Sequence, residues 1–115
     1  MSIQRIEPGK RLSEAVVAGN LVFLAGQVPN DTSKDITGQT ADVLSAIDAL
    51  LAQAGSDKSK LVDVTIFLAD IADYDGMNVA WDAWVDSANP PARATIEARL
   101  ANAAWKVEIK VVASR

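Results

Sequence analysis

Hydrophobic residues form two runs within residues 15–27, and Gly19 and Asn20 separate them. A glycine beside an asparagine is typical of a two-residue hairpin turn, so this pattern predicts two antiparallel strands. Across residues 37–54 the hydrophobic positions recur with the period of a helix, and Gly55 supplies a typical helix end. The first half of the chain therefore predicts a β-hairpin followed by a helix.

The second half predicts a strand, a helix and two more strands. Residues 61–70 are rich in β-branched side chains and apolar on both faces, which favours a covered strand. A helix is expected to begin at Asp73 or Asp75 and to continue to about Ala88. The Asn-Pro-Pro sequence that follows ends it, because proline cannot extend a helix.

Two strands, "ARATIEARL" and "KVEIKVVA", follow the proline pair. Alternation places Arg93 and Thr95 on one face of the first strand and Glu108 on the polar face of the second. If the two strands form an antiparallel pair, Glu108 lies opposite or diagonal to residues 93–97. In such a pair, Arg93 and Glu108 can share one surface.

The order of these elements predicts one α+β domain over residues 1–115, with a sheet that carries both helices on the same face. The strands within residues 15–27 and 61–70 are too apolar for either face to be open to water. We therefore expect another subunit to cover the face that lacks helices.

Composition narrows the possible chemistry. The chain has no Cys and no His, which excludes disulfides, Ser-His or Cys-His nucleophile pairs and zinc sites of the usual ligands. With 11 Lys and Arg against 15 Asp and Glu, the net charge is −4, so no nucleic-acid partner is expected. No apolar stretch has the length of a membrane span or of a signal-peptide core, and we expect a soluble cytoplasmic protein with no membrane partner.

Arg93 and Glu108 are the candidate functional residues. A guanidinium presents a planar fork that matches a carboxylate, and the preceding prolines stiffen its backbone. Glu108 can move a proton. Each of the two could instead be a solvated charge at the surface of its strand, without a function. Asn78 is a further candidate, or it is an exposed polar side chain of the helix. Gly26 either lies close to a ligand or forms a β-bulge.

The segments "GNLVFLAGQVP", "TIFLADIADYDGMNVAW", "PPARATIEARL" and "KVEIKVVA", in this order and spacing, resemble the RidA (YjgF-type) family of reactive-intermediate deaminases, and its YoaB-type members most closely. The resemblance implies a chorismate-mutase-like α+β fold, and a homotrimer whose sheets form a central β-barrel with clefts between subunits. It also implies hydrolysis of small 2-imino or enamine acids to 2-keto acids and ammonia, without cofactor or metal.

By position, the resemblance implies that Arg93 binds the substrate carboxylate and that Glu108 holds the attacking water. It implies that Asn78 lines the cleft and that the backbone amide of Gly26 approaches the ligand. Other positions of the cleft differ from the better-studied members. Leu12 stands where they have a tyrosine, Ala25 where serine is common, Thr95 where cysteine or serine is usual, and Ala101 where proline is frequent.

Two other functions remain open from the residues. A non-catalytic trimer could use the same arginine to bind or sense 2-keto acids. A protein-interaction or chaperone-like trimer could keep the cleft without using it. Release of keto acid from imines separates catalysis from both.

Overall fold

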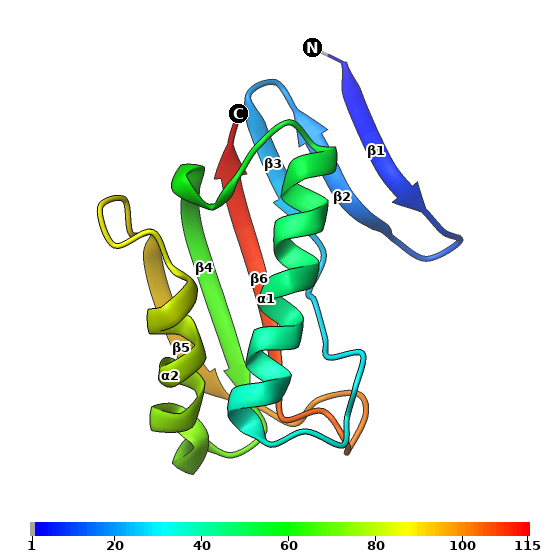
Figure 1. The fold of residues 1–115 in the computed structure, drawn as a ribbon. Helices are drawn as coiled ribbons and strands as arrows, with labels where there is room; N and C mark the ends of the chain where they lie inside the picture. The colour runs from blue at the N-terminus through cyan, green and yellow to red at the C-terminus, as the bar shows by residue number, and fades with distance from the viewer. Residues whose placement is uncertain (1) are drawn as a thin grey trace.

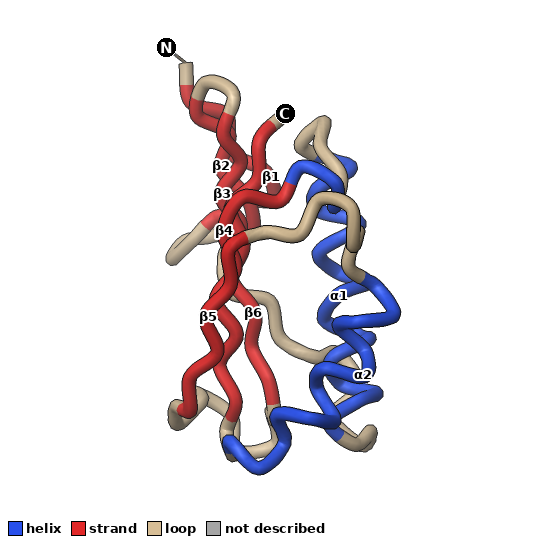
Figure 2. The backbone as a smooth tube through the Cα atoms, turned by 90° about the vertical axis from the view of Figure 1, so that its left-hand side faces the viewer, coloured by secondary structure: helices blue, strands red, loops and turns tan. Residues whose placement is uncertain are grey.

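The computed structural model describes residues 2–115. Two helices cover one face of a six-stranded sheet, and the other face carries no helix (Figures 1 and 2). The α+β class and the placement of the helices are as predicted from the sequence. The strands are β1 (Ile3–Pro8), β2 (Ser13–Ala18), β3 (Leu21–Leu24), β4 (Leu61–Leu68), β5 (Ala92–Glu97) and β6 (Val107–Ser114), and the helices are α1 (Ile36–Gln53) and α2 (Tyr74–Trp84), with short 3₁₀ turns at Lys58–Lys60 and Ile71–Asp73.

The predicted hairpin is confirmed as β2 and β3, which pair antiparallel from Ala15–Leu24 to Ala18–Leu21. Gly19 in the turn has a φ of +62°, a conformation that glycine adopts without the strain a Cβ would add. The sequence did not predict β1, which pairs antiparallel with β2. Its apolar residues Ile3 and Ile6 point to opposite faces, so β1 lacks the alternation that identifies a strand.

Helix α1 matches its predicted range to within one residue at each end. Asp35 caps it by accepting a hydrogen bond from the Gly38 amide at 2.9 Å. Helix α2 is shorter than predicted, because it ends at Trp84 rather than near Ala88. The Asp86 carboxylate accepts from the Ala88 amide at 3.1 Å and so forms a local turn that competes with the helix.

The last two strands do not form the antiparallel pair that was considered from the sequence. Strand β5 pairs with β4, and the two run parallel. Strand β6 lies on the other side of β4, in the sheet order β1-β2-β3-β6-β4-β5. The reason is the connection: α2 crosses over between β4 and β5, as parallel neighbours require, and β6 then takes the remaining edge of β4.

The helix-free face carries exposed apolar side chains, as expected from strands that are apolar on both sides. Among them are Ile3 (51% exposed), Phe23 (37%) and Ile96 (46%). Val62 is also exposed, because a register shift between Leu61 and Asp63 turns it outward. Within residues 2–115, neither helix has the length and apolar character needed to cross a membrane.

Gln39 is a fully buried polar side chain near the N-terminal end of α1. Its Nε2 donates to the carbonyls of Thr32 (3.2 Å), Lys34 (3.3 Å) and Ala104 (3.2 Å). Its Oε1 accepts from the Lys106 amide at 2.8 Å. One side chain therefore holds the loop before α1 and the start of β6, two residues ahead of Glu108.

We expect Gln39→Leu to lower the free energy of unfolding by about 3 kcal/mol, because buried backbone groups would lose their partners at a cost of roughly 1–3 kcal/mol each. Urea denaturation measures this change. The matched control is Gln53→Leu in the same helix, where the exposed side chain donates only to Glu7, and a change below about 0.5 kcal/mol is expected. Equal effects of the two substitutions would contradict an anchoring role for Gln39.

Candidate functional site

Arg93 extends from β5 toward α2 and is partly buried. Its Nη1 donates to Oδ1 of Asn78 at 2.8 Å, and its Nη2 donates to the hydroxyl of Tyr74 at 3.1 Å. The guanidinium carbon also lies 5.2 Å from the centre of the Trp81 ring and 5.7 Å from that of Tyr74. Two hydrogen bonds and two aromatic rings thus fix its orientation.

These partners share one face of α2. Tyr74, Asn78 and Trp81 follow at intervals of four and three residues, the spacing that aligns side chains along a helix. Asn78 was predicted as a cleft residue, and the structure places it against Arg93. Tyr74 and Trp81 were not predicted from the sequence as partners of Arg93. Their shared spacing with Asn78 was the available signal.

Thr95 lies two residues beyond Arg93 on the same face of β5. The pairs Val64–Arg93 and Ile66–Thr95 show this, because registered neighbours point to the same side and both partners on β4 are fully buried. The Thr95 hydroxyl oxygen is itself buried and has no hydrogen-bond partner among residues 2–115. It is a polar atom with unused bonding capacity beside the arginine.

Glu108 lies on the opposite, helix-free face. It pairs with Phe67, whereas its neighbours Val107 and Ile109 are buried beneath the helices. Arg93 and Glu108 therefore do not share the surface that an antiparallel pair would have given them within one protomer. Their separation has two causes: β4 separates their strands, and the polar face of β5 is the face that meets α2.

Gly26 lies directly against Glu108. A Cβ built on Gly26 would come within 2.9 Å of the Glu108 carboxyl carbon and closer still to Oε2. The adjacent residue Gln27 forms a bridge with Ile109, in which the two amide-to-carbonyl bonds measure 2.8 and 3.0 Å. Gly26 is thus a close-approach glycine, and its missing side chain leaves room for the glutamate.

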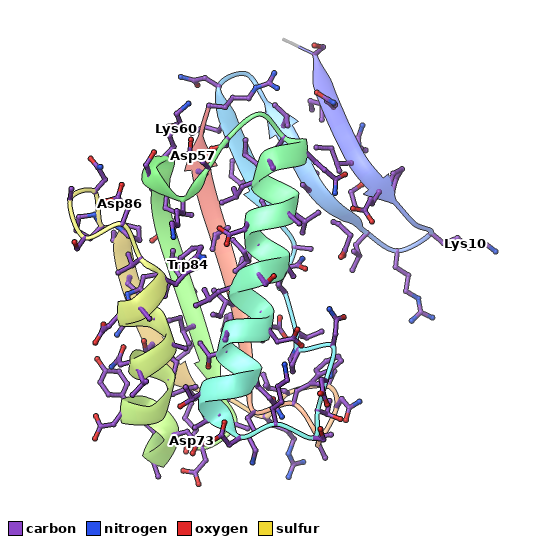
Figure 3. The ribbon with its side chains drawn as sticks, in the orientation of Figure 1. Lys10, Asp57, Lys60, Asp73, Trp84 and Asp86 are labelled. Atoms are coloured by element: carbon purple, nitrogen blue, oxygen red, sulfur yellow. The ribbon has the colours of Figure 1, made fainter. Side chains whose placement is uncertain are left out.

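Leu12 is far from Arg93 in the same protomer. It lies in the turn between β1 and β2, where its carbonyl accepts from the Gly9 amide at 2.8 Å. Strands β3, β6 and β4 stand between this turn and β5, and Figure 3 shows the turn, marked by Lys10, on the opposite side of the molecule from α2. With 56% of its side chain exposed, Leu12 is free to meet another molecule.

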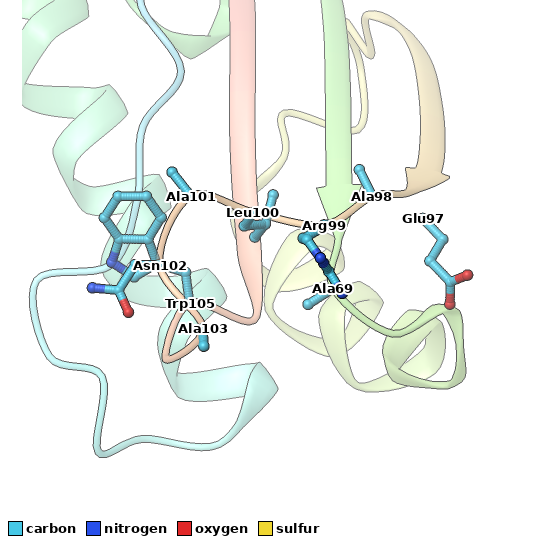
Figure 4. A pocket seen from close by; sticks show the side chains of 9 residues that line it. All are labelled: Ala69, Glu97, Ala98, Arg99, Leu100, Ala101, Asn102, Ala103 and Trp105. Carbon is cyan, nitrogen blue, oxygen red and sulfur yellow. The ribbon is translucent and has the colours of Figure 1, made fainter.

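A pocket of about 620 Å³ opens at the loop between β5 and β6 (Figure 4). Residues 97–103 line it together with Ala69 and Trp105, and Ala101 is one of them. Its lining does not include Arg93 or Glu108, so it is separate from the candidate site. Within residues 2–115, no three His, Cys, Asp or Glu side chains are grouped to hold a metal ion.

The arrangement thus consists of two half-sites, which we call the arginine half-site (Arg93, Asn78, Tyr74, Trp81 and Thr95) and the glutamate half-site (Glu108 and Gly26). The arginine half-site offers an oriented guanidinium for an anion. The glutamate half-site offers a carboxylate that lies against the backbone of Gly26, where no side chain is present. The two occupy opposite faces of the sheet.

Comparison with known proteins gives one consistent result. The family model described as Endoribonuclease L-PSP matches residues 2–115. A RutC family protein of Haemophilus influenzae is 52% identical over 115 residues, which cover 99% of each chain. The crystal structure of NMB1025, a member of the YjgF protein family from Neisseria meningitidis, superposes with a TM-score of 0.98 at 49% identity and covers 100% of this chain and 96% of that one.

The chain belongs to the RidA (YjgF-type) family. The YoaB-type resemblance is also supported: the RutC family protein YoaB of Escherichia coli is 46% identical over 114 residues, or 99% of each chain. The α+β sheet with two helices on one face is the fold of this RidA-family protein and of its YjgF relative.

In this RidA-family chain we expect Gly26→Ala to displace the Glu108 carboxylate with little effect on folding. The added methyl group would occupy the space of the carboxyl group, and a flexible side chain can turn away. The free energy of unfolding should change by less than about 1 kcal/mol. Crystal structures of parent and variant, with denaturant unfolding, test both parts.

Gly9→Ala is the matched control, since a Cβ there would meet only the Leu12 carbonyl oxygen at 3.5 Å, an ordinary contact. It should leave Glu108 where it is. A Glu108 carboxylate that keeps its position in Gly26→Ala would show that the glycine does not set the site.

Proposed function

We propose that this protein hydrolyses small 2-imino acids, or their enamine tautomers, to 2-keto acids and ammonia. The observation that best supports this proposal is the arginine half-site. Both hydrogen-bond partners of Arg93 are neutral, so they orient its charge without neutralising it. A guanidinium held in this way is suited to a small carboxylate. Membership of the RidA family supports the choice of imines as substrates.

In the proposed reaction, Arg93 binds the substrate carboxylate and fixes the position of the C=N carbon. Asn78 and the two aromatic rings keep the guanidinium in place before the substrate arrives. The Thr95 hydroxyl, which is buried without a partner, can accept or donate one further hydrogen bond to the ligand.

Glu108 orients a water molecule that attacks the C=N carbon. The carboxylate takes a proton from this water as the C–O bond forms, and passes it to the nitrogen. The tetrahedral carbon then loses ammonia: the hydroxyl proton moves to the nitrogen, the C–N bond breaks, and the oxygen becomes the keto oxygen. Because an imine is already electrophilic, positioning and charge placement supply the acceleration, without a covalent nucleophile.

The two half-sites can act on one substrate only across a subunit boundary. Arg93 and Glu108 of one protomer lie on opposite faces of the sheet, so each cleft takes its arginine half-site from one subunit and its glutamate half-site from the next. The exposed apolar side chains of the helix-free face supply a surface for this assembly. A homotrimer with three such clefts follows the family resemblance.

The endoribonuclease named in the family description is a weaker candidate. Phosphate contacts supply most of the affinity for nucleic acid, and this chain has a net charge of −4. A binding protein for 2-keto acids would use the same arginine half-site but would not need Glu108. Turnover therefore separates the deaminase from the binding protein.

We expect Arg93→Ala to weaken binding of pyruvate or 2-ketobutyrate at least about tenfold and to abolish detectable hydrolysis, since a hydrogen bond to a charged group contributes roughly 1.5–3 kcal/mol. Arg93→Lys should restore little, because an ammonium lacks the planar fork. Calorimetry measures binding. Keto acid released from imines that an amino-acid oxidase generates in place measures turnover.

Arg99→Ala is the control, since Arg99 is exposed and lies outside both half-sites. It should bind and turn over as the parent does. Equal keto-acid binding by the parent and both Arg93 variants would reject the function. Binding without turnover by the parent would select the sensing protein.

Subunit mixing tests the shared cleft. Arg93→Ala and Glu108→Gln should each be inactive alone, whereas mixed trimers should recover about a third of the parent activity, because one of the three clefts in each mixed trimer joins an intact arginine to an intact glutamate. Co-expression with two affinity tags yields the mixed trimers, and sedimentation gives the number of subunits. A monomer, or mixed trimers without activity, would contradict the shared cleft.

A further inference from the structure

We infer that Tyr74 is a second arm of the carboxylate site, and that its phenol donates a hydrogen bond to the anion that Arg93 holds. This inference rests on the proposed function and adds a substrate-binding residue to it. Tyr74 is the first residue of α2, and it is the only tyrosine of the chain.

The direction of the existing hydrogen bond carries the inference. Arg93 Nη2 can only donate, so the Tyr74 oxygen accepts this bond at 3.1 Å. The phenol keeps its own proton, and no residue within 2–115 accepts it. A carboxylate on the guanidinium fork brings an acceptor oxygen next to the phenol, because the Tyr74 oxygen already lies at hydrogen-bond distance from that fork.

Tyr74 is also more exposed to solvent than a residue that only packs in the core. Trp81, on the same face of α2, is 6% exposed and packs in the core, whereas Tyr74 is 39% exposed. The Tyr74 ring alone can supply the contact with the guanidinium. Removing the hydroxyl therefore leaves the aromatic contact in place, and takes away the donor together with the hydrogen bond that this oxygen accepts from Arg93.

Tyr74→Phe is the direct test. We expect binding of pyruvate to weaken about tenfold, and the KM for the imine to rise by a similar factor, as for loss of one hydrogen bond to a charged group. The value of kcat should fall less, because the hydroxyl meets the carboxylate and not the reacting carbon. The thermal unfolding midpoint should not change, and in the Arg93→Ala background the substitution should have no further effect.

The single tyrosine also provides a spectroscopic readout of ligand binding beside Arg93. Protein labelled with 3-fluorotyrosine gives one ¹⁹F resonance, which belongs to Tyr74. Titration with pyruvate should shift this resonance with the same Kd that calorimetry measures. Pyruvamide, which has the same shape without the charge, should not shift it, and neither should pyruvate in the Arg93→Ala variant.

The outcomes separate this inference from the proposed function. If the parent binds pyruvate and hydrolyses imines, but Tyr74→Phe binds equally and the ¹⁹F resonance does not move, Tyr74 is not a ligand contact and the deaminase assignment stands. If the parent neither binds pyruvate nor hydrolyses imines, both fail. A resonance that shifts together with weaker binding by Tyr74→Phe supports the second arm.

Discussion

The parallel pairing of β4 with β5 is the constraint on which the site depends. Parallel neighbours need a crossover, and α2 provides it, so the helix that joins these strands must also lie over the face of β5 that carries Arg93. The same crossover leaves β6 on the other edge of β4. One topological feature thus brings Asn78 and Tyr74 to the arginine and separates the strands of Arg93 and Glu108, and the alternation along β6 turns Glu108 to the opposite face.

The two half-sites are stabilised in different ways. The arginine half-site lies on an edge strand, and side-chain hydrogen bonds and aromatic contacts with α2 hold it. The glutamate half-site lies on a central strand whose start is fixed by the buried Gln39, and it needs only the space left at Gly26. Rigid backbone supports the glutamate, whereas a network of side chains supports the arginine.

Sequence reasoning succeeded where the signal was local. The period of α1, the turn at Gly19 and the β-branched run of β4 each identify an element without reference to the rest of the chain. Strand pairing is not local. Nothing in "ARATIEARL" distinguishes a parallel neighbour from an antiparallel one, and the deciding feature was the helix before it.

In the candidate site, too, local features could be predicted from the sequence and the spatial arrangement could not. Arg93, Asn78 and Gly26 could be named as candidates from residue type and family resemblance, and the structure places Asn78 on Arg93 and Gly26 against Glu108. What could not be predicted is the face on which each lies. A shift of one residue in alternation reverses every side chain of a strand, and the polar face of β5 is turned toward the helices rather than toward solvent.

The partners of Arg93 bear on why its charge is there. The chain carries 15 acidic side chains against 11 basic ones, so a carboxylate partner would be easy to supply if the arginine served only the fold. Its hydrogen-bond partners are instead an amide and a phenol, and two ring faces pack near it. Neutral partners orient a guanidinium and leave its attraction for an anion largely intact, whereas a carboxylate would compete with any ligand. Under the proposed function, a bound carboxylate supplies the negatively charged partner that neither the amide nor the phenol provides.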